Sequence, residues 1–216
     1  MSMTPQDASH KTQELCRMAP VIPVLVVDDA AHAKPLARAL VRGGLPVLEV
    51  TLRTASALEV IAEMSSVDGG IVGAGTLLTP EDVQSAKDAG ARFGVAPGAT
   101  DRLLSAAESE ALPMLPGAAT ASEAMQLFER GYDMLKFFPA QAAGGPDLLR
   151  GLSGPLPQIR FCPTGGIGPS NAESYLNLPN TVCVGGSWVA PDRLVQSGDW
   201  AAIETLARAA SQLGRD

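Results

Sequence analysis

Short apolar runs rich in valine and isoleucine alternate along this chain with segments whose apolar residues recur every three or four positions. From residue 21 onward the alternation repeats eight times. Apolar runs of β-branched residues predict buried strands, and the longer period predicts amphipathic helices. Repeated strand–helix units are typical of a parallel sheet covered by helices.

The predicted strands are bounded by turn-forming residues. They cover residues 21–27, 46–52, 70–76, 93–98, 113–117, 134–140, 160–166 and 181–188. Helical segments are expected between them at residues 31–41, 56–64, 81–88, 101–111 and 123–130, and an additional helix at 6–18 precedes the first strand.

Several helix boundaries are marked by capping residues. Thr79 stands before Pro80, and Thr120 and Glu123 have the spacing of a capping box. Gly131 follows an amphipathic run at the position of a C-cap glycine. These signals support the helix assignments.

Eight strand–helix units without a visible boundary predict one α/β domain over residues 1–216, a (β/α)8 TIM barrel with an extra N-terminal helix. Residues 1–20 form the leader and that helix. A doubly wound open sheet is the competing architecture, but the residues after the first strand, V-V-D-D-A-A-H, lack its G-x-G-x-x-G fingerprint.

The composition argues against nucleic-acid and membrane partners. The net charge is −7 and aromatic residues make up 4% of the chain, which disfavours general binding to nucleic acid or anionic membranes. The apolar run at 21–27 is too short to span a bilayer and no signal-peptide pattern precedes it, so a cytoplasmic protein is expected.

No cofactor or metal is expected from the sequence. Cys16, Cys162 and Cys183 are far apart and have no C-x-x-C spacing, which favours small buried hydrophobic residues over a disulfide framework or zinc. His10 and His32 lie in the polar leader and at a helix start, and no histidine or acidic cluster indicates a divalent metal.

The run M-L-K-F-F-P-A at 134–140 places an amine among apolar and aromatic residues. As a strand it directs Lys136 and Phe138 to one face and Leu135 and Phe137 to the other. Lysine is rarely buried unless paired, burial disfavours its charged form, and a neutral amine attacks ketones. The alternative is a lysine at a strand end whose ammonium reaches water over an apolar stem.

The second strand reads L-E-V-T-L-R, with Glu49, Thr51 and Arg53 on one face. Glu49 is a candidate general acid/base near Lys136, and Arg53 a candidate for gripping a substrate carboxylate. The alternative is an ion pair that only satisfies charge inside the barrel. At the end of the third strand, Thr76 would bring a hydroxyl next to whatever Arg53 binds.

Two glycine turns follow the last two predicted strands, in P-T-G-G-I-G at 163–168 and V-G-G-S-W at 184–188. Paired glycines let backbone amides approach an anion, and these loops often hold phosphate in barrels. The two glycine turns therefore predict a phosphate site. The proline–glycine turn at Pro97 shapes the rim of the barrel.

Taken together, the motifs L-E-V-T-L-R-T, G-A-G-T-L, L-K-F-F-P-A, P-T-G-G-I and G-G-S-W closely resemble the class I 2-keto-3-deoxy-6-phosphogluconate (KDPG) and 4-hydroxy-2-oxoglutarate (KHG) aldolases of the Entner–Doudoroff pathway. The resemblance implies that Lys136 forms the Schiff base and that Glu49 moves protons. It further implies that the substrate is bound by Arg53, Thr76, Pro97, Phe138, Thr164, Gly165, Gly166, Gly186 and Ser187. Relatives commonly have an acidic residue where this chain has Gln141, which affects loop geometry more than chemistry.

The resemblance implies a homotrimeric aldolase that needs no cofactor and cleaves KDPG to pyruvate and glyceraldehyde 3-phosphate, with KHG as a further substrate. The polar Thr164 favours the gluconate over the galactonate stereoisomer only weakly. Two alternatives lack covalent lysine catalysis: a metal-independent phosphosugar isomerase or transferase, and a noncatalytic module that binds phosphorylated metabolites. They explain the glycine turns but leave Lys136 and Glu49 without a role.

Overall fold

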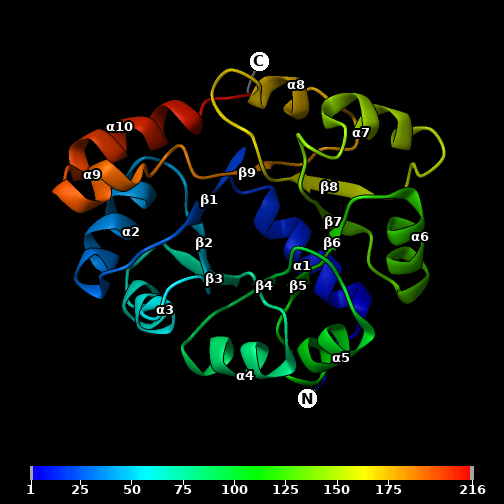
Figure 1. Cartoon of the computed structure of the whole chain (residues 1–216), viewed down its shortest axis with the longest axis horizontal. Helices are drawn as coiled ribbons and strands as arrows, with labels where there is room; N and C mark the ends of the chain where they lie inside the picture. The colour runs from blue at the N-terminus through cyan, green and yellow to red at the C-terminus, as the bar shows by residue number, and fades with distance from the viewer. Residues whose placement is uncertain (1, 215–216) are drawn as a thin grey trace.

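The computed structural model describes residues 2–214, which form an α/β fold around a curled parallel sheet (Figure 1). Every predicted strand segment contains an observed strand. The strands are β1 (Val21–Leu25), β2 (Val47–Thr51), β3 (Ile71–Gly75), β4 (Gly94–Val95), β5 (Met114–Leu115), β6 (Gly117–Ala118), β7 (Met134–Phe137), β8 (Arg160–Pro163) and β9 (Val184–Gly186).

The strands pair in parallel in two ladders. Six strands follow the order β5-β4-β3-β2-β1-β9, and three follow the order β6-β7-β8. Isolated parallel bridges join Phe161 to Thr181 and Thr164 to Gly185, next to β8 and β9. The single strand predicted at 113–117 is instead divided into β5 and β6, because Pro116 between them has no N–H to continue the ladder.

Most helices lie outside the strands, whereas α1 crosses the middle of the ring that the strands outline (Figure 1). The helices are α1 (Pro5–Cys16), α2 (Ala33–Arg42), α3 (Ala57–Ser65), α4 (Pro80–Asp88), α5 (Asp101–Ser109), α6 (Ala121–Arg130), α7 (Gly145–Ser153), α8 (Ala172–Leu176), α9 (Asp192–Ser197) and α10 (Trp200–Ala210). The segment predicted as a helix at 31–41 begins with a 3-10 turn, η1 (Ala30–His32).

The predicted helix caps are present. The hydroxyl of Thr79 accepts a hydrogen bond from the Asp82 amide at 3.1 Å. At α6, Thr120 accepts from the Glu123 amide at 3.3 Å, and the Glu123 carboxylate accepts from the Thr120 amide at 2.9 Å. Gly131 ends α6 with φ 113°, a left-handed conformation that favours glycine.

Alternate strand residues face two different cores. Leu135 and Phe137 of β7 pack in the layer between strands and helices, while Met134 belongs to a separate inner cluster enclosed by the strands. Lys136 shares the inner face with Met134, as the period of two predicts. The apolar members of the inner cluster are Ile22, Val47, Phe93, Val95, Leu115 and Met134, together with the three cysteines.

Helix α1 lies against the amino-terminal ends of the strands. The hydroxyl of the buried Ser9 accepts hydrogen bonds from the amides of Asp133 at 2.9 Å and Met134 at 2.8 Å, where β7 begins. It also donates to the Asp133 carboxylate at 2.7 Å. One side chain thus fixes α1 to β7.

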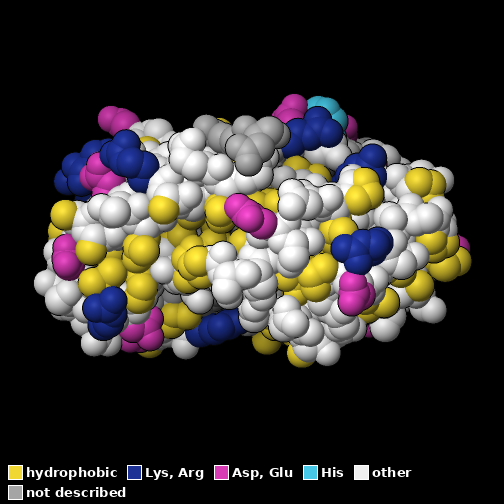
Figure 2. Space-filling model, turned by 90° about the horizontal axis from the view of Figure 1, so that it is seen from above, with side chains coloured by type: hydrophobic (Ala, Val, Ile, Leu, Met, Phe, Trp, Pro, Cys, Tyr) yellow, Lys and Arg dark blue, Asp and Glu magenta, His cyan; other side chains and the backbone are white. Residues whose placement is uncertain are grey.

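The surface carries charges of both signs. Figure 2 shows lysine and arginine side chains beside aspartates and glutamates at several places on one face, with apolar side chains scattered between them. Among residues 2–214, no helix combines the length and apolar character needed to cross a bilayer.

We predict that Ser9→Ala lowers the free energy of unfolding by about 2 kcal/mol, because it leaves the buried Met134 amide and the partly buried Asp133 amide without an acceptor. Ser122→Ala, at an exposed position on α6, is the control and should change it by less than about 0.5 kcal/mol. Urea denaturation followed by circular dichroism measures both values. Equal effects of the two substitutions would show that Ser9 does not fix α1.

Candidate active site

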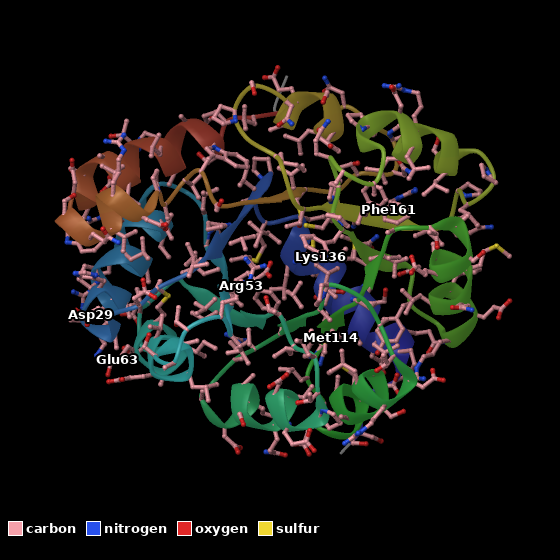
Figure 3. All side chains as sticks on the ribbon, in the orientation of Figure 1. Asp29, Arg53, Glu63, Met114, Lys136 and Phe161 are labelled. Atoms are coloured by element: carbon pink, nitrogen blue, oxygen red, sulfur yellow. The ribbon has the colours of Figure 1, made fainter. Side chains whose placement is uncertain are left out.

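An ion pair between Lys136 and Glu49 lies at the centre of the molecule. Lys136 Nζ is 3.2 Å from Glu49 Oε1, and the side chains are only 6% and 4% exposed. Lys136 comes from β7 and Glu49 from β2, which belong to different ladders. The pair therefore spans the space enclosed by the strands, as the sequence predicts for two inward-facing residues. Lys136 is labelled near the middle of that space in Figure 3.

Space for the Glu49 carboxylate is provided by Gly75 on the neighbouring strand β3. A Cβ atom at Gly75 would collide with the carboxylate group of Glu49. The ring of Phe93 likewise occupies the space that a side chain at Gly73 would need. The motif G-A-G-T gives no sign of this steric role, because the side chains that fill the space come from other segments of the chain.

The aromatic ring of Phe138 lies beside Lys136. The Phe138 ring centroid is 5.3 Å from Lys136 Nζ, a distance suited to a cation–π contact. A Cβ atom at Gly165 would touch the same ring. Phe138 is half-buried and therefore borders both the buried ion pair and the loop after β8.

Arg53 and Thr76 meet at the ends of β2 and β3. Arg53 Nε donates to Thr76 Oγ1 at 3.3 Å, which leaves the two Nη groups to grip a carboxylate. Thr76 has φ 62°, an unfavourable conformation for a β-branched residue that costs about 1–3 kcal/mol and is typical of functional sites. Figure 3 shows Arg53 and Lys136 inside the ring of strands, whereas Asp29 and Glu63 lie outside it, beside the outer helices.

The two glycine turns also lie side by side, because Thr164 and Gly185 form a parallel bridge. Gly165 and Gly166 have φ values of 105° and 73°, and neither amide donates a hydrogen bond to another residue within 2–214. The exposed Ser187 follows Gly186 in the second turn. These turns present free amides and a hydroxyl of the kind that bind an anion.

Pro97 lies on the rim near this centre. Its carbonyl approaches Gly117, where any Cβ atom would collide with it, and Gly117 pairs in register with Lys136. The two histidines lie elsewhere, as predicted: His10 is beside Glu14 on α1, and the ring of His32 packs against Trp200.

A side-chain network behind the first glycine turn was missed by the sequence analysis. Gln141 Oε1 accepts from the Tyr175 hydroxyl at 2.9 Å and from Asn171 Nδ2 at 3.3 Å. Asn171 in turn accepts from the Gly168 amide at 2.8 Å and donates to the Gly166 carbonyl at 3.0 Å. Burial raises the pKa of Tyr175, which keeps its hydroxyl a donor. The departure at Gln141 was the only sequence signal for this network.

This arrangement suits a keto acid with an anionic group at its far end. A buried amine beside a carboxylate can form an imine with a ketone, and the carboxylate can carry the protons. The guanidinium of Arg53 can hold a carboxylate. The unpaired amides of Gly165 and Gly166 can hold a phosphate.

Comparison with known proteins gives a family match. The model of the aldolase family described as KDPG and KHG aldolase matches residues 12–206. A 2-dehydro-3-deoxy-phosphogluconate aldolase from Pseudomonas aeruginosa is 48% identical, over 95% of this chain and 94% of the relative.

Solved structures agree with this match. KDPG aldolase from Legionella pneumophila, with pyruvate captured as a covalent carbinolamine intermediate, has a TM-score of 0.89 and 44% identity, covering 92% of this chain and 97% of that one. The Zymomonas mobilis ZM4 2-keto-3-deoxy-6-phosphogluconate aldolase with 3-phosphoglycerate has a TM-score of 0.89 and 47% identity, covering 94% and 96%.

We predict that Gly75→Ala destabilises the fold mainly through Glu49. In a double-mutant cycle, Gly75→Ala should cost about 1–3 kcal/mol less when Glu49 is already alanine, because the new methyl then meets no carboxylate. Gly151→Ala is the control, since a Cβ atom there meets open space. Urea denaturation gives each free energy. Strictly additive effects of Gly75→Ala and Glu49→Ala would contradict the steric account.

Proposed function

The chain belongs to the KDPG and KHG aldolase family, and we propose that it is a Schiff-base (class I) aldolase that cleaves 2-keto-3-deoxy-6-phosphogluconate to pyruvate and glyceraldehyde 3-phosphate. The observation that carries this proposal is the buried ion pair between Lys136 and Glu49 at 3.2 Å. An isomerase or a binding module would have no use for an amine held there.

The reaction begins when Lys136 transfers a proton to Glu49 and its free amine attacks the ketone at carbon 2. Glu49 then returns the proton to the departing hydroxyl, so that the carbinolamine loses water and becomes an imine. The short distance between the two groups supports this exchange, since proton transfer requires hydrogen-bond contact. The Legionella relative captured with a carbinolamine supports the same intermediate.

The protonated imine acts as an electron sink for the bond cleavage. Removal of the proton on the carbon-4 hydroxyl by Glu49 lets the bond between carbons 3 and 4 break, and the electron pair moves into an enamine. Glyceraldehyde 3-phosphate leaves as the aldehyde. Protonation of the enamine at carbon 3 and hydrolysis of the imine then release pyruvate and restore Lys136.

The surrounding residues hold the two ends of the substrate. We assign the carboxylate of the keto acid to Arg53 and Thr76, which already contact one another at 3.3 Å. The assignment of the far end to the glycine turns is supported by their unpaired amides and by the relative solved with 3-phosphoglycerate. Gly165, Gly166 and Ser187 would hold the phosphate. Thr164 and Gly186 would line this end of the site, and Pro97 and Phe138 would enclose the adduct.

KHG, which yields pyruvate and glyoxylate, is proposed as a second substrate. It shares the keto acid end of KDPG, so that Lys136, Glu49 and Arg53 would act on it unchanged. Its far end is a carboxylate instead of a phosphate, and the same free amides can donate hydrogen bonds to either anion. The matching family model includes aldolases for both compounds.

We further infer that the two ladders form one closed (β/α)8 barrel with α1 as an extra N-terminal helix, in a single domain. The bridge between Phe161 and Thr181 supports closure on one side. On the other side, the last strand of one ladder, β5, and the first strand of the other, β6, are separated along the chain by Pro116 alone. The family resemblance supports a homotrimer, and a substrate from central sugar metabolism supports a cytoplasmic enzyme.

Replacement of Lys136 tests this function. Lys136→Arg keeps a cation for Glu49 but removes the nucleophilic amine, so pyruvate release from KDPG should fall roughly a thousandfold or more. Lys136→Ala should lose as much turnover, and Lys34→Arg, which changes an outer lysine paired with Glu63, should retain it. A lactate dehydrogenase-coupled assay measures the rates. Near-normal turnover by Lys136→Arg would exclude covalent catalysis by this lysine.

A further inference from the structure

The three cysteines of the chain gather in one place. Cys16 is the last residue of α1, Cys162 lies on β8, and Cys183 directly precedes β9. Their sulfur atoms all lie within 4.8 Å of one another, and all three residues are buried. The sequence predicted their burial correctly, but their wide spacing along the chain gave no sign of the cluster.

The cluster lies in the apolar part of the inner core. Its neighbours include Ile22, Val47 and Met134, and one polar side chain, Thr164, places its hydroxyl 4.0 Å from the Cys162 sulfur. The form of cysteine that binds metals is the thiolate, and the three sulfurs lie close enough together to share one ion.

The sulfur positions suit one ion bound by three thiolates. Sulfurs placed about 2.3 Å from a common ion lie about 4.0 Å apart in a trigonal plane, and about 3.4 Å apart in the pyramid formed by an ion that carries a lone pair. The observed spacing of at most 4.8 Å reaches the pyramidal geometry if each pair of sulfurs moves together by at most about 1.4 Å. Soft thiolate ligands of this kind select soft, thiophilic ions.

The charge of the surroundings narrows the choice of ion. Three thiolates with a monovalent ion carry a net charge of −2, and with a divalent ion −1. The nearest cation, Lys136, is already paired with Glu49, so such a charge would be buried without compensation. A trivalent ion gives a neutral complex, which is the form that an apolar core tolerates.

We propose that Cys16, Cys162 and Cys183 form a binding site for a trivalent thiophilic metalloid ion, for which arsenite is the probe. In binding, three arsenic–oxygen bonds of arsenous acid break and three arsenic–sulfur bonds form. Each hydroxyl leaves as water with the proton of one thiol, so the oxidation state of arsenic does not change and no other reagent is needed.

An entry route lies beside the cluster. A pocket of about 520 Å³ opens at the amino-terminal end of the strands and is lined by Leu15 and Met18 around the end of α1, and by Ile71 at the start of β3. Leu15 and Ile71 also pack against the cluster that contains the three thiols. A small displacement of the end of α1 would therefore connect the thiols with this pocket.

The test uses the reduced full-length protein and sodium arsenite. Equilibrium dialysis with elemental mass spectrometry should give one arsenic per chain, and X-ray absorption should give three sulfur neighbours around it. Cys16→Ala, Cys162→Ala and Cys183→Ala should each weaken binding at least tenfold. Cys16 is the last residue of α1 and is not among the residues assigned to the substrate. Unchanged aldolase turnover by Cys16→Ala therefore shows that this variant is folded, and it separates failure of this proposal from failure of the proposed function.

Any one of three results would overturn this proposal. The folded protein could bind no arsenic, Cys16→Ala could bind arsenite as tightly as the unsubstituted chain, or the bound arsenic could have fewer than three sulfur neighbours. Any of these would leave the thiols as packed apolar groups. Ser2→Ala, far from the cluster on the exposed leader, is the control and should bind arsenite normally.

Discussion

The structure depends on one constraint: a lysine and a glutamate must be kept together where almost no water reaches them. Burying either charge alone would cost several kcal/mol, so Lys136 and Glu49 each require the other. The strands meet that requirement from opposite ladders, and Gly75 leaves the carboxylate the space that it needs. The same ion pair places a carboxylate within hydrogen-bond distance of the amine, as the proposed mechanism requires of its base.

The interior is layered along the strands around this pair. Below it, towards the amino-terminal ends, lie apolar side chains and the three thiols, with α1 across the end. Beyond it, at the carboxyl ends, Arg53 and the glycine turns present hydrogen-bond donors. Under the proposed mechanism, a substrate entering from the carboxyl ends would meet these hydrogen-bond donors first and Lys136 deeper, above an apolar layer.

The local sequence pattern was sufficient to predict much of the fold and the position of the central ion pair. The period of two placed Lys136 and Glu49 on inward faces, and the capping residues marked the helix starts, because these depend on neighbours in the chain. The pattern could not reveal which distant residues meet. The Gln141 network, the contact between Gly75 and Glu49, and the thiol cluster all depend on how the sheet curls.

The central claim is that Lys136 becomes covalently bonded to the keto acid. The most direct measurement is intact mass after incubation with pyruvate and borohydride, followed by peptide mapping. The account predicts a single reduced pyruvyl adduct, located on Lys136 and lost in Lys136→Arg. A folded protein that gains no adduct, or gains it on another lysine, while a known Schiff-base aldolase is labelled under the same conditions, would contradict it.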